Sequence, residues 1–191
     1  MLKTQAEANV PTEYGNFRMI AFSENESDWM PHMAIIAENT DFTKPVNVRF
    51  HSECITGEVF HSKKCECGQQ LDAAMKFMHE NGGIINKLKA YALQEKGFDT
   101  VEANLKLGLP ADDRDFAAAI EILTMLDVKE INLLTNNPEK MKIVENSNII
   151  LNKRIPLQMT ATKESESYLK VKKDYFGHLL TDKTDPDKKT L

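Results

Sequence analysis

The spacing of apolar residues changes along this chain, and that change limits the folds open to it. Within the first fifty residues, the apolar residues form short and partly alternating runs at 16–22, 33–37 and 46–51, which is typical of strands. Further along they recur at helical spacing, as at Leu71 and Met75. A β-rich N-terminal part followed by helix–strand alternation predicts an α+β or mixed α/β domain built around a mixed sheet.

The remaining elements follow from the same patterns. We expect helices at 69–79, at 86–96 and around 116–123, and strands at 130–135 and within 148–157. Pro138 suits the first position of another helix. A chain of 191 residues is long enough for one domain with a sizeable core, and we expect residues 1–180 to form it. The charged stretch 181–191 is expected to be a frayed tail.

The bulk charge excludes some classes of partner. A net charge of −5 and a pI near 5.6 argue against a non-specific nucleic-acid binder, although they leave room for a local basic pocket. The sequence shows neither the apolar N-terminal stretch of a signal peptide nor a run of about 18 apolar residues. We therefore expect a cytoplasmic protein with no nucleic-acid and no membrane partner.

All three cysteines lie close together in the sequence. Ten residues separate Cys54 from Cys65, and a single residue separates Cys65 from Cys67. Three thiols cannot pair off as disulfides, and an odd, low count fits a reducing compartment. Three thiolates around one Zn²⁺, with a fourth position left for water, are what a hydrolytic metal site requires.

The same three cysteines also fit two roles without catalysis. They could be small buried apolar residues, although the flanking residues are polar and Gly-rich. They could also form a closed structural zinc site, with His51 or His61 as the fourth ligand. The sequence pattern by itself leaves both roles open.

Three further runs have both a structural and a chemical interpretation. The run from Arg49 to Glu53 fits an exposed strand end, or a cation, an imidazole, a hydroxyl and a carboxylate beside a metal. Acidic residues suit a helix N-terminus, where a cation such as Arg114 is mildly unfavourable. The chemical interpretation makes Asp112 a general base and Arg114 a phosphate-binding group. The turn before Lys140 is an ordinary strand–turn–helix connection, or an anion site made of backbone N–H groups.

Taken together, these motifs resemble GTP cyclohydrolase II, the enzyme that opens the riboflavin pathway. The set of motifs is specific, although no single one is, and it covers most of the chain. The matching runs are Pro11-Thr12, the cysteine cluster, Tyr91-Ala92-Leu93-Gln94, residues 97–104, Asp112-Asp113-Arg114-Asp115, residues 133–138 and Gly177-His178-Leu179-Leu180.

The resemblance implies a zinc- and magnesium-dependent reaction. GTP would be converted to 2,5-diamino-6-(5-phospho-D-ribosylamino)pyrimidin-4(3H)-one, formate and diphosphate. Zn²⁺ held by Cys54, Cys65 and Cys67 would activate the water that attacks C8 of the purine, and Mg²⁺ would accompany the phosphates. Members of the family are homodimers, so the expected partners are GTP and a second copy of the chain.

The resemblance also implies roles for individual residues. Asp112 matches the proton acceptor, and Arg114 matches the group that attacks the α-phosphorus to form a covalent guanylyl intermediate. Charge stabilisation by Arg114 is the rival role, because a protonated guanidinium is a poor nucleophile. Tyr91 would face the ring or the metal-bound water. The residues expected to contact GTP are Arg49, Phe50, His51, Ser52, Glu53, Gln70, Thr100, Thr135 and Lys140.

The chain departs from the family after Gly83. Roughly fourteen residues are missing there, a strand and a Gly-rich loop of the kind that lets backbone approach a phosphate. Either the natural chain contains the segment and the sequence as written omits it, or the deletion is genuine and the protein is a catalytically impaired paralogue with a structural zinc. We favour omission, because losing a buried strand would leave its sheet neighbours unpaired in a marginally stable domain.

Overall fold

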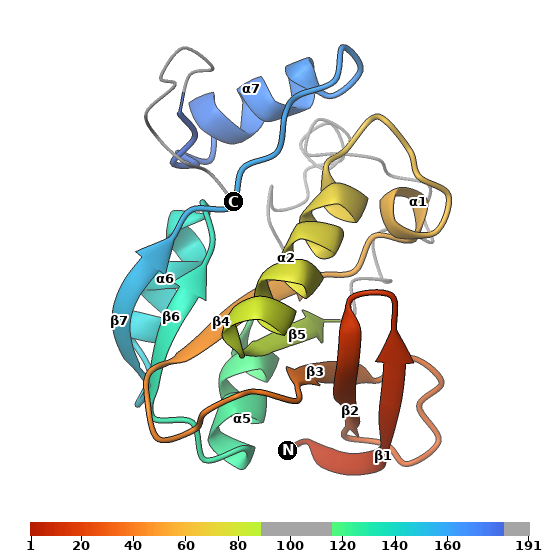
Figure 1. The fold of residues 1–191 in the computed structure, drawn as a ribbon. Coiled ribbons are helices and arrows are strands. Elements are labelled where there is room, and N and C mark those ends of the chain that lie inside the picture. The colour runs from red at the N-terminus through yellow and green to blue at the C-terminus, as the bar shows by residue number, and fades with distance from the viewer. Residues whose placement is uncertain (89–115, 182–191) are drawn as a thin grey trace.

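One mixed sheet organises the protein. The computed structural model describes residues 1–88 and 116–181, and these ranges contain seven strands and five helices, arranged as in Figure 1. The sheet has the order β1-β2-β3-β5-β4-β6-β7. The strands are β1 (Lys3–Thr12), β2 (Gly15–Ser23), β3 (His32–Ala37), β4 (Val46–Ser52), β5 (Ile84–Leu88), β6 (Glu130–Leu134) and β7 (Ile150–Ile155). The predicted mixed α/β domain with a β-rich N-terminal part is confirmed.

The sheet has an antiparallel half and a parallel half. Strands β1, β2, β3 and β5 pair antiparallel in turn, whereas β5, β4, β6 and β7 pair parallel. Strand β5 therefore joins the two halves. In open sheets with parallel strands, ligands bind beyond the carboxyl ends of those strands, which draws attention to the ends of β4 and β6.

Helices cover both faces of the sheet. Helix α2 (Cys67–Asn81) packs on one face, and α5 (Ala117–Met125) and α6 (Pro138–Glu145) pack on the other. The short helix α1 (Ile55–Glu58) leads from β4 toward α2, and α7 (Glu166–Asp174) lies beyond the end of the sheet in Figure 1. None of the helices in the described ranges has both the length and the apolar character that a membrane span requires.

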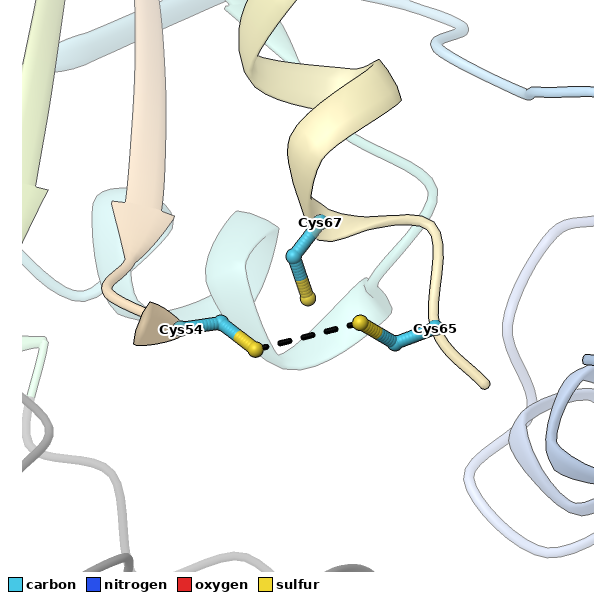
Figure 2. A group of neighbouring side chains, drawn as sticks. All are labelled: Cys54, Cys65 and Cys67. Atoms are coloured by element: carbon cyan, nitrogen blue, oxygen red, sulfur yellow. Dashed lines mark hydrogen bonds between the residues drawn. The ribbon is translucent and has the colours of Figure 1, made fainter. Parts of the chain in front are cut away.

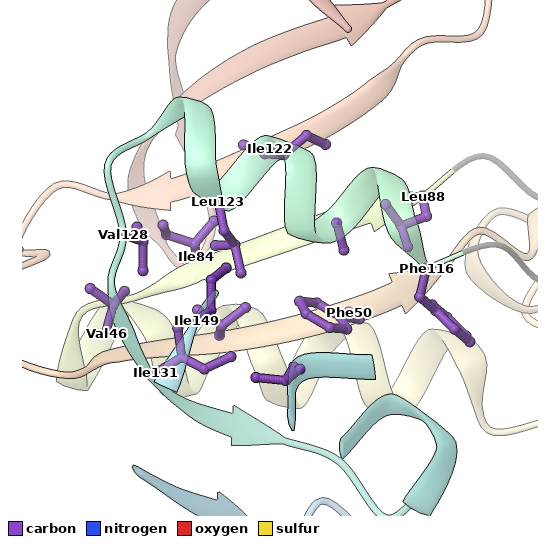
Figure 3. Packing of buried hydrophobic residues seen from close by; sticks show 14 of the residues in the cluster. Val46, Phe50, Ile84, Leu88, Phe116, Ile122, Leu123, Val128, Ile131 and Ile149 are labelled. Atoms are coloured by element: carbon purple, nitrogen blue, oxygen red, sulfur yellow. The ribbon is translucent and has the colours of Figure 1, made fainter. Parts of the chain in front are cut away.

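Side chains alternate in direction along the central strands, so the apolar core has two parts, one on each face of the sheet. Val46, Val48 and Phe50 point toward α5 and α6, where Figure 3 shows Phe50 among Leu123, Ile131 and their neighbours. On the opposite face, α2 contributes Ala74, Met75 and Met78, which pack with Ile35 and Ile85. Because side chains alternate along a strand, Arg49 and His51 of β4 share the α2 face of the sheet.

Several predicted elements are confirmed, and one is wrong. The strands at 16–22, 33–37, 46–51 and 130–135, the helix at 69–79 and the helix starting at Pro138 all appear with small shifts of their ends. The helix predicted at 86–96 is wrong for residues 86–88, which belong to β5; residues 89–96 lie outside the described ranges.

Strand β5 also corrects the expectation that a missing segment would leave its neighbours unpaired. Ile84–Leu88 pairs with β3 on one side and with β4 on the other, so the sheet is continuous. The stability argument for an omitted segment therefore does not hold. Residues 182–191, most of the predicted tail, lie outside the described ranges.

Candidate active site

The three thiols of the cysteine cluster converge on one point. Cys54 follows β4, Cys65 lies in the loop before α2, and Cys67 is the first residue of α2. Their Sγ atoms all lie within 4.8 Å of one another, and those of Cys54 and Cys65 are 3.8 Å apart (Figure 2). We call residues 54–67 the metal loop.

Two glycines permit this convergence. A Cβ atom on Gly57 would lie 2.6 Å from Cys65 Sγ, and a Cβ atom on Gly68 would lie 2.5 Å from the Gly57 carbonyl oxygen. The turn of α1 therefore touches the start of α2 through backbone alone. Any larger side chain at either position would push the thiols apart.

The thiols also perturb one another electrostatically. Hydrogen bonds from the Cys65 and Cys67 thiols lower the pKa of Cys54. The same hydrogen bonds to Cys54 raise the pKa of Cys65 and the pKa of Cys67, because a second thiolate would form beside the first. A divalent cation would offset this repulsion and allow all three thiols to ionise.

The geometry fits zinc. Thiolates bound to tetrahedral Zn²⁺ at about 2.3 Å lie about 3.8 Å from each other, which agrees with the Cys54–Cys65 separation. Among the described residues, the group of possible ligands at this point contains the three cysteines, and neither His51 nor His61 belongs to it. This arrangement favours an open site over the closed site with a histidine ligand.

A buried carboxylate connects the metal loop to β4 and β5. Glu58 Oε1 accepts a hydrogen bond from the Cys54 N–H at 2.6 Å and lies 3.0 Å from His51 Nε2, while Glu58 Oε2 lies 3.1 Å from Lys87 Nζ. Burial opposes ionisation of Glu58, but its bonds to His51 and Cys54 and the charge of Lys87 outweigh burial and lower its pKa. Glu58 therefore fixes the backbone that carries Cys54 and orients His51.

A polar pocket lies beside the metal loop, at the carboxyl ends of β4 and β6. It brings together six of the residues that the resemblance assigns to GTP, and Cys67 forms part of its wall. These six residues are Arg49, His51, Ser52, Gln70, Thr135 and Lys140.

A chain of hydrogen bonds crosses the pocket floor. Arg49 Nη2 donates to Gln70 Oε1 at 2.6 Å, and Gln70 Nε2 donates to Glu66 Oε2 at 3.1 Å. Burial lowers the pKa of Arg49 to about 10, so this side chain remains a cation at neutral pH. Burial also raises the pKa of Glu66, whose Oε1 has no hydrogen-bond partner among the described residues.

His51 is held in one tautomer. Arg49 Nε donates to its Nδ1 at 3.4 Å, which leaves Nε2 to carry the proton and donate to Glu58. Burial lowers the pKa of His51 to about 4, so the imidazole is neutral near pH 7.

Thr135 reaches the pocket from the end of β6, and Lys140 reaches it from the first turn of α6. Asn137 caps α6 by accepting the Glu139 N–H at 2.9 Å, with Pro138 in the first turn, as predicted. This start places Lys140 Nζ 2.7 Å from the Phe50 carbonyl oxygen. Thr135 Oγ1 accepts the Asn137 N–H at 3.0 Å and holds the turn.

Other expected site residues lie elsewhere. Phe50 has no exposed surface and its ring packs in the core, so only its backbone faces Lys140. Glu53 is paired with Lys87 at 2.6 Å and does not line the pocket. Tyr91, Thr100, Asp112 and Arg114 lie outside the described residues.

The structure adds lining residues that the sequence did not predict for the site. They are Glu66, Asn136, Asn137, Leu157, Lys172, His178 and Leu180. A signal existed for His178 and Leu180, which belong to a motif that matched the family. Nothing in the spacing of Glu66 or Lys172 marked them as part of a pocket.

Comparison with known proteins supplies the family. Residues 3–156 match the sequence model of GTP cyclohydrolase II. The chain belongs to this family. It is 42% identical over 196 residues to GTP cyclohydrolase-2 of Neisseria gonorrhoeae (strain ATCC 700825 / FA 1090), covering 95% of this chain and 98% of that protein.

Longer relatives contain a similar region. The chain is 43% identical over 194 residues to riboflavin biosynthesis protein RibBA of Bacillus cereus (strain ATCC 14579), covering 94% of this chain and 49% of that protein. The chain thus spans about half the length of this relative. RibBX, a two-domain 3,4-dihydroxy-2-butanone 4-phosphate synthase from A. baumannii, shares the fold with a TM-score of 0.51 and 14% identity, over 83% of this chain and 40% of that one.

The alignment lengths bear on the departure after Gly83. The match to the B. cereus relative spans 194 residues, yet it includes only 94% of the 191 residues of this chain. The relative therefore carries residues within the match that have no counterpart here, which agrees with the shortening inferred from the resemblance.

Proposed function

We propose that this protein is a GTP cyclohydrolase II that converts GTP to 2,5-diamino-6-(5-phospho-D-ribosylamino)pyrimidin-4(3H)-one, formate and diphosphate, the first step of riboflavin biosynthesis. The observation that carries the proposal is the three-thiol group directly beside a cationic pocket, in a chain of this family. Cys54, Cys65 and Cys67 would hold Zn²⁺, which supplies Lewis-acid activation of the water that attacks C8.

The described residues of the pocket bind and orient the substrate in this proposal. Arg49 and Lys140 are buried cations that suit the negative charge of a nucleoside triphosphate, and Mg²⁺ would travel with its phosphates. The amide of Gln70 accepts a hydrogen bond from Arg49 and donates one to Glu66, so its orientation in the pocket is fixed. Ser52 Oγ is buried without a partner among the described residues and is available to a ligand.

The acid–base and phosphorus chemistry is assigned to residues outside the described ranges. Asp112 is the proposed proton acceptor, and Arg114 is the proposed nucleophile toward the α-phosphorus or a stabiliser of its charge. Phe116, where the described chain resumes, has its ring 5.0 Å from Lys140 Nζ. The described chain therefore resumes beside a pocket lysine two residues after Arg114, which supports a role for this run in the site.

The setting of the enzyme is also part of the proposal. We propose a homodimer that works in the cytoplasm, with GTP as its partner and no nucleic acid or membrane. Sedimentation of the zinc-loaded protein would test the dimer, and a mass of one chain at micromolar concentration would contradict it.

Formate release from GTP tests the central proposal. Purified protein should release one formate per GTP consumed, and removal of zinc by a chelator should abolish the reaction until zinc is restored. Intact mass should be measured on the same sample, because a value near 21.7 kDa would show that the chain lacks the segment after Gly83. Stoichiometric zinc without formate release, in a chain of that mass, would identify an impaired nucleotide-binding paralogue instead.

A further inference from the structure

The pocket has a wall that lies beyond the region matched by the family's sequence model. The family match ends at residue 156, whereas Lys172, His178 and Leu180 line the pocket. We call residues 157–181 the C-terminal arm. The arm starts after β7 and carries α7 (Figure 1), and its last residues line the pocket.

The arm is attached to the domain at both ends. At its start, Leu157 is buried against the α2 face of the sheet, and its backbone bonds to the Asn136 side chain at 2.7 Å. At its end, the Leu179 N–H donates to the Asn136 carbonyl oxygen at 2.8 Å. Between them, Thr162 Oγ1 donates to the Lys63 carbonyl oxygen of the metal loop at 2.8 Å. Both pocket and metal loop therefore contact the arm.

A left-handed glycine turns the arm toward the pocket. Helix α7 ends at Asp174, and Gly177 follows with φ +61°. The turn places His178 on the pocket, where its N–H donates to the Lys172 carbonyl oxygen at 3.0 Å. The two side chains thus reach the pocket from adjacent parts of the arm.

The charges in the pocket favour an anion. Among the described residues, Arg49, Lys140 and Lys172 line it together with one carboxylate, that of Glu66. Lys172 Nζ lies 3.8 Å from Glu66 Oε2, with 15% of its side chain exposed. Three cationic side chains around one pocket suit a ligand with several negative charges, such as a polyphosphate.

We propose that Lys172 and His178 of the C-terminal arm bind the phosphate groups of the nucleotide. This inference rests on the proposed function and adds two substrate-binding residues to it. Lys172 acts as a mobile point charge, and His178 donates a hydrogen bond to a phosphate oxygen. The arm then couples phosphate binding to the metal loop through Thr162.

Two substitutions and one control test the arm. In the zinc-loaded full chain, Lys172→Met and His178→Phe should each raise the KM for GTP by about tenfold or more, since a charge-assisted hydrogen bond contributes about 1.5–3 kcal/mol. The inhibition constant of inorganic triphosphate should rise by a similar factor, with zinc content and guanosine affinity unchanged. Lys170→Met, an exposed lysine of the same helix, is the matched control and should behave as wild type.

A double variant separates phosphate binding from neutralisation of Glu66. If Lys172 only balances that carboxylate, adding Glu66→Gln to Lys172→Met should restore affinity for triphosphate, and that result would overturn the proposal. Unchanged KM in both single variants, or equal loss of guanosine and triphosphate binding, would overturn it too. If the wild-type protein releases no formate, the proposed function fails, and calorimetric binding of inorganic triphosphate to the same variants still decides the role of the arm.

Discussion

The metal loop and the C-terminal arm approach the same pocket from distant parts of the sequence, and they are held in different ways. The metal loop is fixed by backbone contact between Gly57 and the start of α2, and by the buried carboxylate of Glu58. The arm rests on a few hydrogen bonds, and the described side chains of α7 are exposed or half-buried. Close packing makes a region intolerant of small changes, whereas a loosely held segment can shift at little cost.

This difference predicts two kinds of response to substitution. Changes in the metal loop should remove zinc and activity together. Changes in the arm should leave zinc in place and alter substrate affinity by degrees. The four predictions that follow run from the largest expected effect to the smallest.

Replacing a ligand should have the largest effect. Cys54→Ser should lose zinc and lower formate release by more than about 100-fold, because loss of a ligand exceeds the 10- to 100-fold typical of outer-shell partners. Metal analysis and the formate assay on one preparation check this. Lys64→Met, an exposed residue of the same loop, serves as control. Retention of one zinc per chain by Cys54→Ser would contradict an essential ligand role.

Glu58→Gln should have the second-largest effect. The change keeps the size of the side chain but removes the charge that faces His51 and Lys87. We expect zinc affinity to fall by about 10- to 100-fold, measured by competition with a chromophoric chelator. Glu80→Gln, at an exposed position of α2, should have no effect. An unchanged zinc affinity would show that the glycine contact alone positions Cys54.

Gly57→Ala tests that contact directly. The added methyl group would lie 2.6 Å from Cys65 Sγ, and overpacking of this kind costs about 1–3 kcal/mol. We expect zinc affinity to fall by about tenfold while the circular dichroism spectrum keeps its native shape. Normal zinc affinity in this variant would mean that the metal loop can shift to accommodate the methyl group. The metal loop would then be no more rigid than the C-terminal arm.

Gly177→Ala is the counterpart in the arm and should have the smallest effect. Nothing lies within 4 Å of an added Cβ there, so the cost comes only from φ +61°, about 1–2 kcal/mol for a left-handed residue. We expect a KM for GTP raised several-fold with full zinc content. Loss of zinc in this variant would show that the arm supports the metal loop as strongly as the glycine contact does.

The sequence predicted best where side-chain pattern and local chemistry agree. The apolar alternation of β4 and β6, the helical spacing of α2 and the Asn137-Pro138 start of α6 each carry their own signal. The three cysteines likewise pointed to a metal group, because their flanking residues are polar and Gly-rich and their number does not allow all of them to pair as disulfides.

The parts of the structure that the sequence did not predict have physical causes. Strand β1 is an edge strand with mostly exposed side chains, so backbone pairing with β2 defines it rather than alternation. Asn86 is fully buried in β5, and its Oδ1 lacks a partner among the described residues. Pairing of β5 with β3 and β4 therefore outweighs the low strand propensity of asparagine. Lys172 was not predicted as a pocket residue because the position of the arm depends on long-range contacts with Asn136 and Lys63.

The backbone contact between Gly57 and Gly68 has a consequence for how the protein acquires its ion. Small zinc domains fold only when the metal binds, whereas this domain has two apolar clusters, one on each face of its sheet, that stabilise its fold. Metallation can therefore follow folding as a separate, reversible event. The emptied protein should keep its native spectrum and accept Co²⁺, whose visible absorption would report the coordination of the refilled site.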